Sequence, residues 1–215
     1  MPPHRLVEVS PERLEGWLGR FAHRHGTLST TAVTADEVVI TAADAAAARC
    51  AVPFPPLGEN RTDPYGGLVE HAGATRRVGV LLVRLGGYAA GVFDGDTLVA
   101  SKVGSRQVHG RTSAGGQSQQ RFARRREGQA RVALAAAADV AFRVLLPAVA
   151  DLDAVVLGGD RRAVTAVMAD ARLAGLRPLV ISRLLDVPDP RLRVLAATPQ
   201  QFRAVQIRVI DPTCG

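Results

Sequence analysis

The sequence has few cysteines, few aromatic residues and no long apolar segment. Its two cysteines, Cys50 and Cys214, are far apart and form neither a metal-ligand spacing nor a disulfide framework. This pattern favours a reducing, cytoplasmic protein that has no bound metal. No stretch approaches about 20 uninterrupted apolar residues, and the N-terminus lacks the apolar run of a signal peptide. We therefore expect no membrane-spanning helix and no membrane partner.

The scarcity of aromatic side chains restricts what can fill the core. Only 4% of the residues are aromatic, whereas 47% are hydrophobic. A core of useful size is therefore available, but alanine, valine and leucine must fill most of it. The length of 215 residues fits one large domain, or one domain with a smaller appendage.

Positive charge is concentrated in one part of the chain. Residues 102–131 contain eight basic residues and a single acid, Glu127, so this window alone carries the net charge of +7 of the whole chain. In the remaining residues, basic and acidic side chains are equal in number. A basic segment on a neutral body favours a polyanionic partner such as a nucleic-acid backbone, although such runs are also found as merely solvated surface.

The first 75 residues are predicted to form an N-terminal subdomain. Ser10-Pro11 and the apolar spacing that follows predict a helix that ends at Gly26, with Trp17 packed in the core. Residues 28–34 and 37–41 favour a hairpin, and the alanine-rich residues 42–50 favour a short helix. Many helix and strand breakers follow between residues 53 and 67, which indicates a long loop. The role of residues 1–75 is not evident from their sequence.

Residues 76–215 are predicted to form a second domain in which strands alternate with helices. Three short apolar runs joined by Gly-Gly and Asp94-Gly95 turns predict an antiparallel meander. A long helix after Gln117 should end before Pro147. The expected strands are 78–83, 88–93, 97–103, 152–157, 179–181 and 206–210, and the other expected helices are 161–174, capped by Asp160 and Gly175, and 199–205. The predicted fold class is α/β (α+β): a mixed β-sheet with packed helices, plus a small N-terminal α/β subdomain.

The most distinctive segment connects the meander to the long helix. It is a polar loop that ends in Gly115-Gly116-Gln117 and continues into an arginine-rich helix. Two adjacent glycines allow the backbone to adopt positive φ and to approach another molecule closely. Gln117 offers a backbone N–H and an uncharged side-chain amide. The loop contains no Asp, Glu or Cys, and His109 is its only neutral base, so neither a protein nucleophile nor a protein general base is well supported.

Arginines flank this loop on both sides. Arg121, Arg124 and Arg125 have the i, i+3, i+4 spacing that groups side chains on one helix face. Arginine suits bidentate contacts with phosphate. We therefore predict that an RNA backbone binds here, and the candidate RNA-contacting residues are Arg111, Arg121, Arg124, Arg125 and Arg126.

The string Gly115-Gly116-Gln117-Ser118-x-x-Arg121-Phe122-x-Arg124-x-Arg126 closely resembles the central catalytic domain of eukaryotic and archaeal class-1 peptide-chain release factors. The resemblance covers roughly residues 76–210. More narrowly, the chain resembles the actinobacterial-type branch of release-factor-like peptidyl-tRNA hydrolases. That branch is related to the eukaryotic tRNA hydrolase that rescues stalled large ribosomal subunits.

The resemblance implies a catalytic Gly115, Gly116 and Gln117, no cofactor, and the large ribosomal subunit with peptidyl-tRNA as partners. It implies a water attack on the peptidyl-tRNA ester, with the Gln117 backbone N–H at the reaction centre. Residues 1–75 contain no codon-reading motif, which favours rescue of stalled chains over stop-codon termination, and a monomer is expected off the ribosome. Two alternatives stay open: an endonuclease that removes the tRNA 3′ end, and a non-catalytic ribosome- or RNA-binding module.

Overall fold

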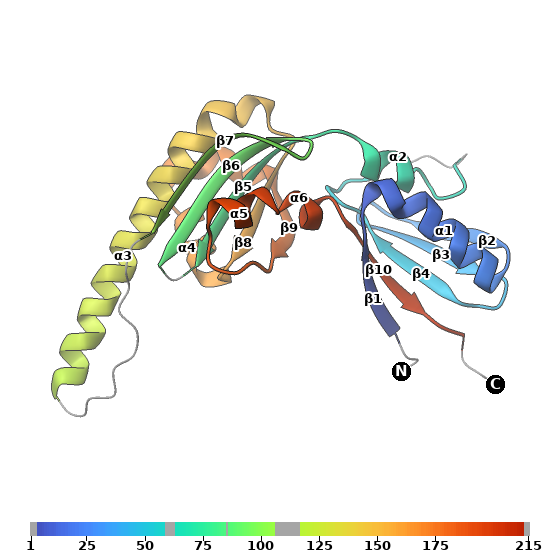
Figure 1. Ribbon diagram of the computed structural model, residues 1–215, viewed down its shortest axis with the longest axis horizontal. Helices are drawn as coiled ribbons and strands as arrows, with labels where there is room; N and C mark the ends of the chain where they lie inside the picture. The colour runs from blue at the N-terminus through green and yellow to red at the C-terminus, as the bar shows by residue number, and fades with distance from the viewer. Residues whose placement is uncertain (1–3, 59–62, 85, 106–116, 213–215) are drawn as a thin grey trace. The chain divides into compact units, whose positions relative to one another are not determined.

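The structure is a computed structural model that describes residues 4–58, 63–84, 86–105 and 117–212. Within the long helix it describes the backbone from Gln117 and the side chains from Glu127. The chain divides into two compact units (Figure 1). The first unit comprises Met1–Ala74 and Pro199–Gly215, and the second comprises Thr75–Thr198.

The first unit is a five-stranded antiparallel sheet with helices on one face. The strand order is β1-β10-β4-β3-β2. The strands are β1 (His4–Val9), β2 (Leu28–Val33), β3 (Glu37–Ala42), β4 (Ala47–Ala51) and β10 (Val205–Ile210), and the helices are α1 (Pro11–His25), α2 (Leu68–Gly73) and α6 (Pro199–Phe202). Alternate strand residues such as Ile40 and Ile207 face α1, whose Leu14 and Leu18 are fully buried. The opposite sheet face carries polar side chains such as Arg49 and Arg208 together with the exposed Leu6.

Helix α1 follows its sequence signals closely. It begins at Pro11 after Ser10 and ends at His25, before Gly26 with φ of +89°. The predicted helix and the predicted hairpin of residues 28–34 and 37–41 are thus confirmed. Trp17 packs against the core of the first unit as predicted, although it is only half-buried.

The alanine-rich segment 42–50 was predicted to be helical, and this prediction is wrong. Residues 43–46 form a turn, and Ala47–Ala51 form strand β4 between β3 and β10. The helix propensity of alanine is high relative to other residues but small in free energy, and pairing on both edges of a strand outweighs it here. Cys50 and Ala48 on this strand are fully buried in the core of the first unit.

The C-terminal strand β10 belongs to the first unit. We expected residues 76–215 to form one domain, but β10 pairs with β1 over six residues and with β4 over four. The structure divides the chain after Ala74, and Pro199–Gly215 joins the N-terminal segment. Neither β1 nor this long-range pairing has a signal in the local sequence.

The second unit contains a mixed five-stranded sheet with the order β7-β6-β5-β8-β9. Strands β5 to β7 form the predicted antiparallel meander, and β8 and β9 are parallel to β5 and to each other. The strands are β5 (Arg77–Arg84), β6 (Gly87–Asp94), β7 (Thr97–Ser105), β8 (Ala154–Gly159) and β9 (Val180–Leu185). The predicted α/β class with a mixed sheet and packed helices is confirmed.

Helices of different lengths cover this sheet. They are α3 (Gln117–Leu145), α4 (Arg161–Met168), α5 (Leu192–Ala196) and the 3-10 helices η1 (Leu146–Asp151) and η2 (Ala171–Leu179). The long helix packs on the sheet through Ala137, Ala141 and Leu145, all fully buried. Alanine at positions 137 and 141 lets the helix axis approach the strands closely, which suits a core with few aromatic rings.

The helix predicted over residues 161–174 is shorter than expected. Asp160 caps its start as predicted, and the Asp160 carboxylate accepts a hydrogen bond of 2.9 Å from the Ala163 N–H. The helix ends at Met168, because the Asp170 side chain accepts the Arg172 N–H at 2.9 Å and starts η2. Such local side-chain bonds compete with the helical pattern. Gly175 therefore lies inside η2, and its predicted role as a helix C-cap is wrong.

Candidate functional site

The candidate loop lies between β7 and α3 in the second unit. Strand β7 ends at Ser105 and α3 begins at Gln117, so the two described elements bracket the segment as the sequence predicted. Arg111, Gly115 and Gly116 lie outside the described residues, and their predicted roles stay predictions. The geometry of the site is therefore given by the strand that leads into it and by the helix that leaves it.

Gln117 occupies the first position of α3. The first four backbone N–H groups of an α-helix have no acceptor within the helix, and the aligned peptide dipoles make this end positive. Gln117 is the first residue at which the structure describes this helix, and its predicted role, to donate a hydrogen bond to an oxygen that gains negative charge, stays a prediction.

The predicted arginines occupy the first turns of the same helix. At 3.6 residues per turn, the backbone positions of Gln117, Arg121 and Arg124 lie within about 60° of one another around the axis. Arg125 lies beside this stripe, and Arg126 lies about 100° further around the helix. The helical backbone thus brings Gln117 onto the same stripe as Arg121 and Arg124, and separates Arg126 from it.

The start of α3 lies far from the core of the second unit. Among the described side chains of the helix, the first buried one is Ala137. At 1.5 Å per residue, Gln117 is about 30 Å from Ala137 along the axis. Figure 1 shows this yellow-green part of α3 extending past the end of the sheet. We call residues Gln117–Ala136 the projecting segment.

The C-terminal half of α3 is fixed to the body by packing and by ionic contacts. The Arg172 guanidinium of η2 donates to the Asp139 carboxylate at 2.7 Å, and it lies 5.6 Å from the Phe142 ring centre. The same guanidinium bonds to Asp170 at 2.7 Å, and these hydrogen bonds lower the Asp170 pKa to about 2. These contacts anchor the helix beyond the projecting segment.

Strand β7 carries a close glycine contact just before the loop. Gly104 pairs with Tyr88 of β6, and the Tyr88 ring lies over the space that a Cβ at position 104 would fill. Lys102, on the same strand, is exposed. This contact fixes β7 against β6 one residue before β7 ends.

The described chain contains no metal site. Across residues 4–58, 63–84, 86–105 and 117–212, no group of three His, Cys, Asp or Glu residues could hold a metal ion. The free thiol of Cys50 is buried, and burial raises its pKa to about 12, which makes it a poor nucleophile.

One helical segment is long and apolar enough to cross a membrane by length and composition alone. Glu127–Asp151 contains an 18-residue window with a mean hydropathy of 1.9. This test is also met by core helices of soluble proteins, and the segment packs on the sheet through Ala141 and Leu145. It also contains the charged residues Arg131, Asp139 and Arg143.

The sequence interpretation missed a set of arginines in the first unit. Arg13, Arg20 and Arg24 line two hollows beside Trp17 on α1. Arg13, Trp17, Arg20 and Arg24 have the spacing i, i+4, i+7 and i+11, which places all four positions on one helix face. That spacing is the signal that identifies them, and the balanced charge of the surrounding chain concealed it.

Comparisons with known proteins place the second unit in a family. The family of actinobacterial and chloroflexi VLRF1 release factors matches residues 76–208, which is more than half of the chain. The chain is also similar to an archaeal translation termination factor, aRF1 (16% identity, TM-score 0.43, 76% of this chain and 51% of the other), and to a structure described as an archaeal protein (17% identity, TM-score 0.36, 76% and 52%). It thus spans about half the length of these structures, and no curated protein matches it.

The matched region coincides with the part of the chain that carries the release-factor resemblance. It runs from the start of β5 through α3 and into β10, and so includes Gly115, Gly116 and Gln117. The extent of the resemblance predicted from sequence, roughly residues 76–210, is confirmed. The chain belongs to the actinobacterial and chloroflexi VLRF1 release factor family.

Proposed function

We propose that the protein is a cytoplasmic peptidyl-tRNA hydrolase that releases nascent peptides from stalled ribosomal complexes. The observation that carries this proposal is the Gly-Gly-Gln sequence at the start of α3, within the region that matches a release factor family. The partners are the large ribosomal subunit and peptidyl-tRNA. No cofactor is required, and the protein is monomeric away from the ribosome.

The reaction is hydrolysis of the ester between the peptide and the terminal ribose of tRNA. A water molecule attacks the carbonyl carbon, and the negative charge that develops on the carbonyl oxygen is stabilised by a donated hydrogen bond. The Gln117 backbone N–H is the donor, supported by the positive end of α3. The Gln117 side chain shapes the water site.

The scarcity of acid–base groups in the loop sequence favours proton transfer by RNA. Residues 106–116 contain no acidic residue and no cysteine, and His109 is the only neutral base. Hydroxyl groups of the substrate RNA therefore accept and return the proton. The protein supplies position and a hydrogen-bond donor, and it reacts only within the ribosomal active centre.

The projecting segment suits delivery of Gln117 into a narrow site. It separates Gln117 from the first buried residue of α3 by about 30 Å, a distance comparable to the diameter of a small domain. Gly115 and Gly116 keep side-chain bulk away from the tip. Arg121 and Arg124, on the Gln117 stripe, bind RNA phosphates, while Arg111, Arg125 and Arg126 provide further positive charge.

The test uses stalled large-subunit complexes that carry peptidyl-tRNA. Gln117→Ala keeps the backbone N–H but removes the side chain that shapes the water site, so it should lower the rate of peptide release by about 100-fold, as expected when the attacking water is misplaced. Gln119→Ala is the matched control, because two residues rotate the position by about 200° to the other side of the helix. Full activity of Gln117→Ala would refute the role of the Gln117 side chain.

The released tRNA distinguishes hydrolysis from the two alternatives. Ester hydrolysis leaves an intact 3′-terminal adenosine, whereas an endonuclease removes the 3′ end. A binding module without catalysis releases no peptide, yet it binds ribosomes with a steep salt dependence. Under our proposal Arg121→Gln and Arg124→Gln weaken ribosome binding and each lowers the salt slope by about 0.7 to 0.9.

A further inference from the structure

Two adjoining hollows lie along one side of α1 in the first unit, and they share Trp17 and Arg20. The smaller has a volume of about 170 Å³ and the larger about 560 Å³. The larger lies within the range of about 300–1,000 Å³ that is typical of ligand sites. We call the two together the α1 groove. Strand β1, at the edge of the sheet, forms its opposite wall.

The α1 groove is strongly basic. Its lining includes four exposed arginines: Arg5 on β1, and Arg13, Arg20 and Arg24 on α1. In the described part of the chain, none of these four forms an ion pair with a carboxylate. Glu8 is the only acid in the lining, and its carboxylate accepts a hydrogen bond from Gln206. Guanidinium groups that line one groove and form no ion pair with a carboxylate favour an anionic ligand.

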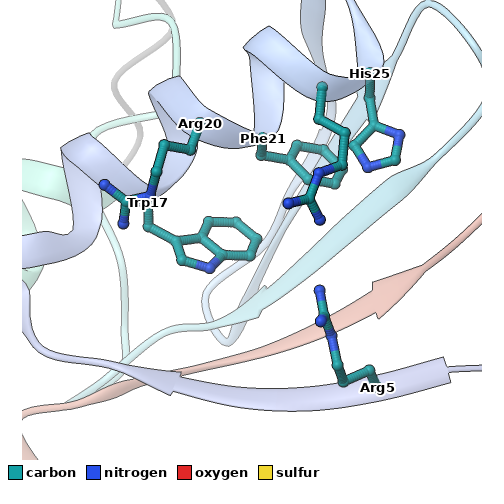
Figure 2. A pocket seen from close by; sticks show the side chains of 6 residues that line it. Arg5, Trp17, Arg20, Phe21 and His25 are labelled. Atoms are coloured by element: carbon teal, nitrogen blue, oxygen red, sulfur yellow. The ribbon is translucent and has the colours of Figure 1, made fainter.

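An aromatic surface lies among these arginines. The indole of Trp17 stacks on Phe21, with ring centres 5.5 Å apart and planes 8° apart, and Phe21 in turn contacts His25 at 4.7 Å. Trp17 is half-buried and lines both hollows. Figure 2 shows its indole between α1 and β1, with the Arg5 side chain extending from β1 toward the helix.

The combination of charge and stacking surface selects the ligand. Successive bases stack on exposed aromatic rings while basic side chains hold the phosphates, which is how proteins bind single-stranded nucleic acid. Only an unpaired base exposes a free face to an indole. An acidic peptide would use the arginines but not the indole. We propose that the α1 groove binds single-stranded RNA, with a base on Trp17 and phosphates on Arg5, Arg20 and Arg24.

This site is separate from the hydrolytic one. It lies wholly in the first unit, whereas Gln117 lies in the second. It assigns an RNA-binding role to residues 1–75, whose sequence alone indicates none. Binding requires no ester, so an RNA oligonucleotide tests the groove independently of peptide release.

Trp17 provides a direct signal because it is the only tryptophan in the chain. The full-length protein is titrated with an unstructured single-stranded RNA of about 10 nucleotides, within the site sizes of known single-strand binders. Arg121→Gln and Arg124→Gln are present throughout, so that binding at α3 contributes less. A base that stacks on the indole should quench Trp17 fluorescence, with the dissociation constant at or below about 100 μM at physiological salt.

Substitutions then identify the residues that bind the RNA. Arg5→Gln combined with Arg24→Gln should weaken binding and lower the salt slope by about 0.7 for each phosphate that is no longer neutralised. Arg208→Gln is the matched control, because Arg208 is exposed on β10 and points to the opposite face of the same sheet. Trp17→Leu should weaken binding of a fluorescently labelled RNA by about 5- to 100-fold, measured by anisotropy. Circular dichroism checks that Trp17→Leu is folded. If Trp17→Leu unfolds, the variant with Arg5→Gln and Arg24→Gln tests the proposal instead.

Several results would overturn the proposal. One is the absence of Trp17 quenching at about 100 μM RNA, the weak end of non-specific binding. Another is equal weakening by Arg208→Gln and by the Arg5 and Arg24 pair. Stronger quenching by a polyglutamate peptide of the same charge would assign the groove to an acidic protein partner. If the parent protein releases no peptide while Trp17 quenching by RNA is intact, only the hydrolase proposal is refuted.

Discussion

Gly104 on β7 tests how the meander positions the start of the candidate loop. A Cβ at position 104 would lie 2.4 Å from Cε2, 2.6 Å from Cζ and 2.7 Å from the hydroxyl oxygen of Tyr88. Carbon atoms normally approach to about 3.5–4.0 Å, so the ring would have to move by about 1 Å. Tyr88 is only 8% exposed and belongs to the core of the second unit. We expect Gly104→Ala to lower the free energy of unfolding by about 1–3 kcal/mol, as for other overpacked cores.

The assay separates the two units of the protein. Far-UV circular dichroism in urea follows the second unit through the 29-residue helix α3, whereas Trp17 fluorescence follows the first unit. Gly104→Ala should shift the first signal and leave the second unchanged. In a double-mutant cycle, Tyr88→Leu should remove most of the penalty, because the ring that the new methyl group contacts is gone.

Gly128→Ala is the matched control for this experiment. A Cβ at position 128 of α3 would have nothing within 4 Å, and alanine in a helix interior is favoured over glycine by up to about 1 kcal/mol. A glycine-to-alanine substitution should therefore stabilise the protein at position 128 and destabilise it at position 104. The reasoning fails if Gly104→Ala is as stable as the parent protein, or if its penalty persists unchanged beside Tyr88→Leu.

Two further predictions concern titratable groups. Hydrogen bonds from Arg172 hold the pKa of Asp170 at about 2, against a usual value of 3.8, so this carboxylate stabilises the fold fully above about pH 4 and progressively less as the pH falls toward 2. Arg172→Gln should flatten the fall of the thermal midpoint over that range, and an unchanged pH profile would contradict the assignment. Burial raises the pKa of Cys50 to about 12, which leaves a thiolate fraction of about 10⁻⁴ at pH 8. In a Cys214→Ser variant, a thiol reagent should therefore modify Cys50 only as the first unit unfolds in urea, and rapid modification without urea would show that the thiol is accessible.

The parts of the fold that the sequence predicted depend on local signals. The turn at Asp94-Gly95 has Gly95 at φ of +62° and joins β6 to β7 as expected. Ser10-Pro11 starts α1, and Pro147 lies just beyond the end of α3. In each case the decisive interaction involves residues within a few positions of one another, so the sequence contains the whole signal.

The parts that the sequence missed depend on partners far away in the chain. Ala47–Ala51 is a strand because β10, more than 150 residues later, pairs with it. Likewise, β1 has no clear alternation, and it is held by pairing with β10 rather than by its own pattern. Propensity and periodicity contain no information about such pairings, and therefore the expected unit of residues 76–215 included a strand of the other sheet.

The candidate site divides in the same way. The grouping of Arg121 with Arg124 follows from the helix period, and the backbone of α3 agrees with it. The α1 groove required the fold, because Arg5 comes from β1 and reaches the arginines of α1 only through the packing of that helix on the sheet. Net charge does not reveal the groove, since the acids Glu12 and Glu15 lie elsewhere on the same helix.

The composition of the projecting segment explains how a helix can extend away from its own core. Residues 127–136 contain no fully buried residue, and Leu134 and Ala136 are only partly buried against the core, so tertiary packing supports this part of α3 less than the part from Ala137 onward. Isolated helices shorter than about 12–15 residues are marginal, and longer ones need residues of high helix propensity. Residues 117–136 are mostly alanine, arginine and glutamine, which are among the strongest helix formers. The arginines that we propose to bind phosphate thus also support the helix, which is why charge and reach occur in one segment of the chain.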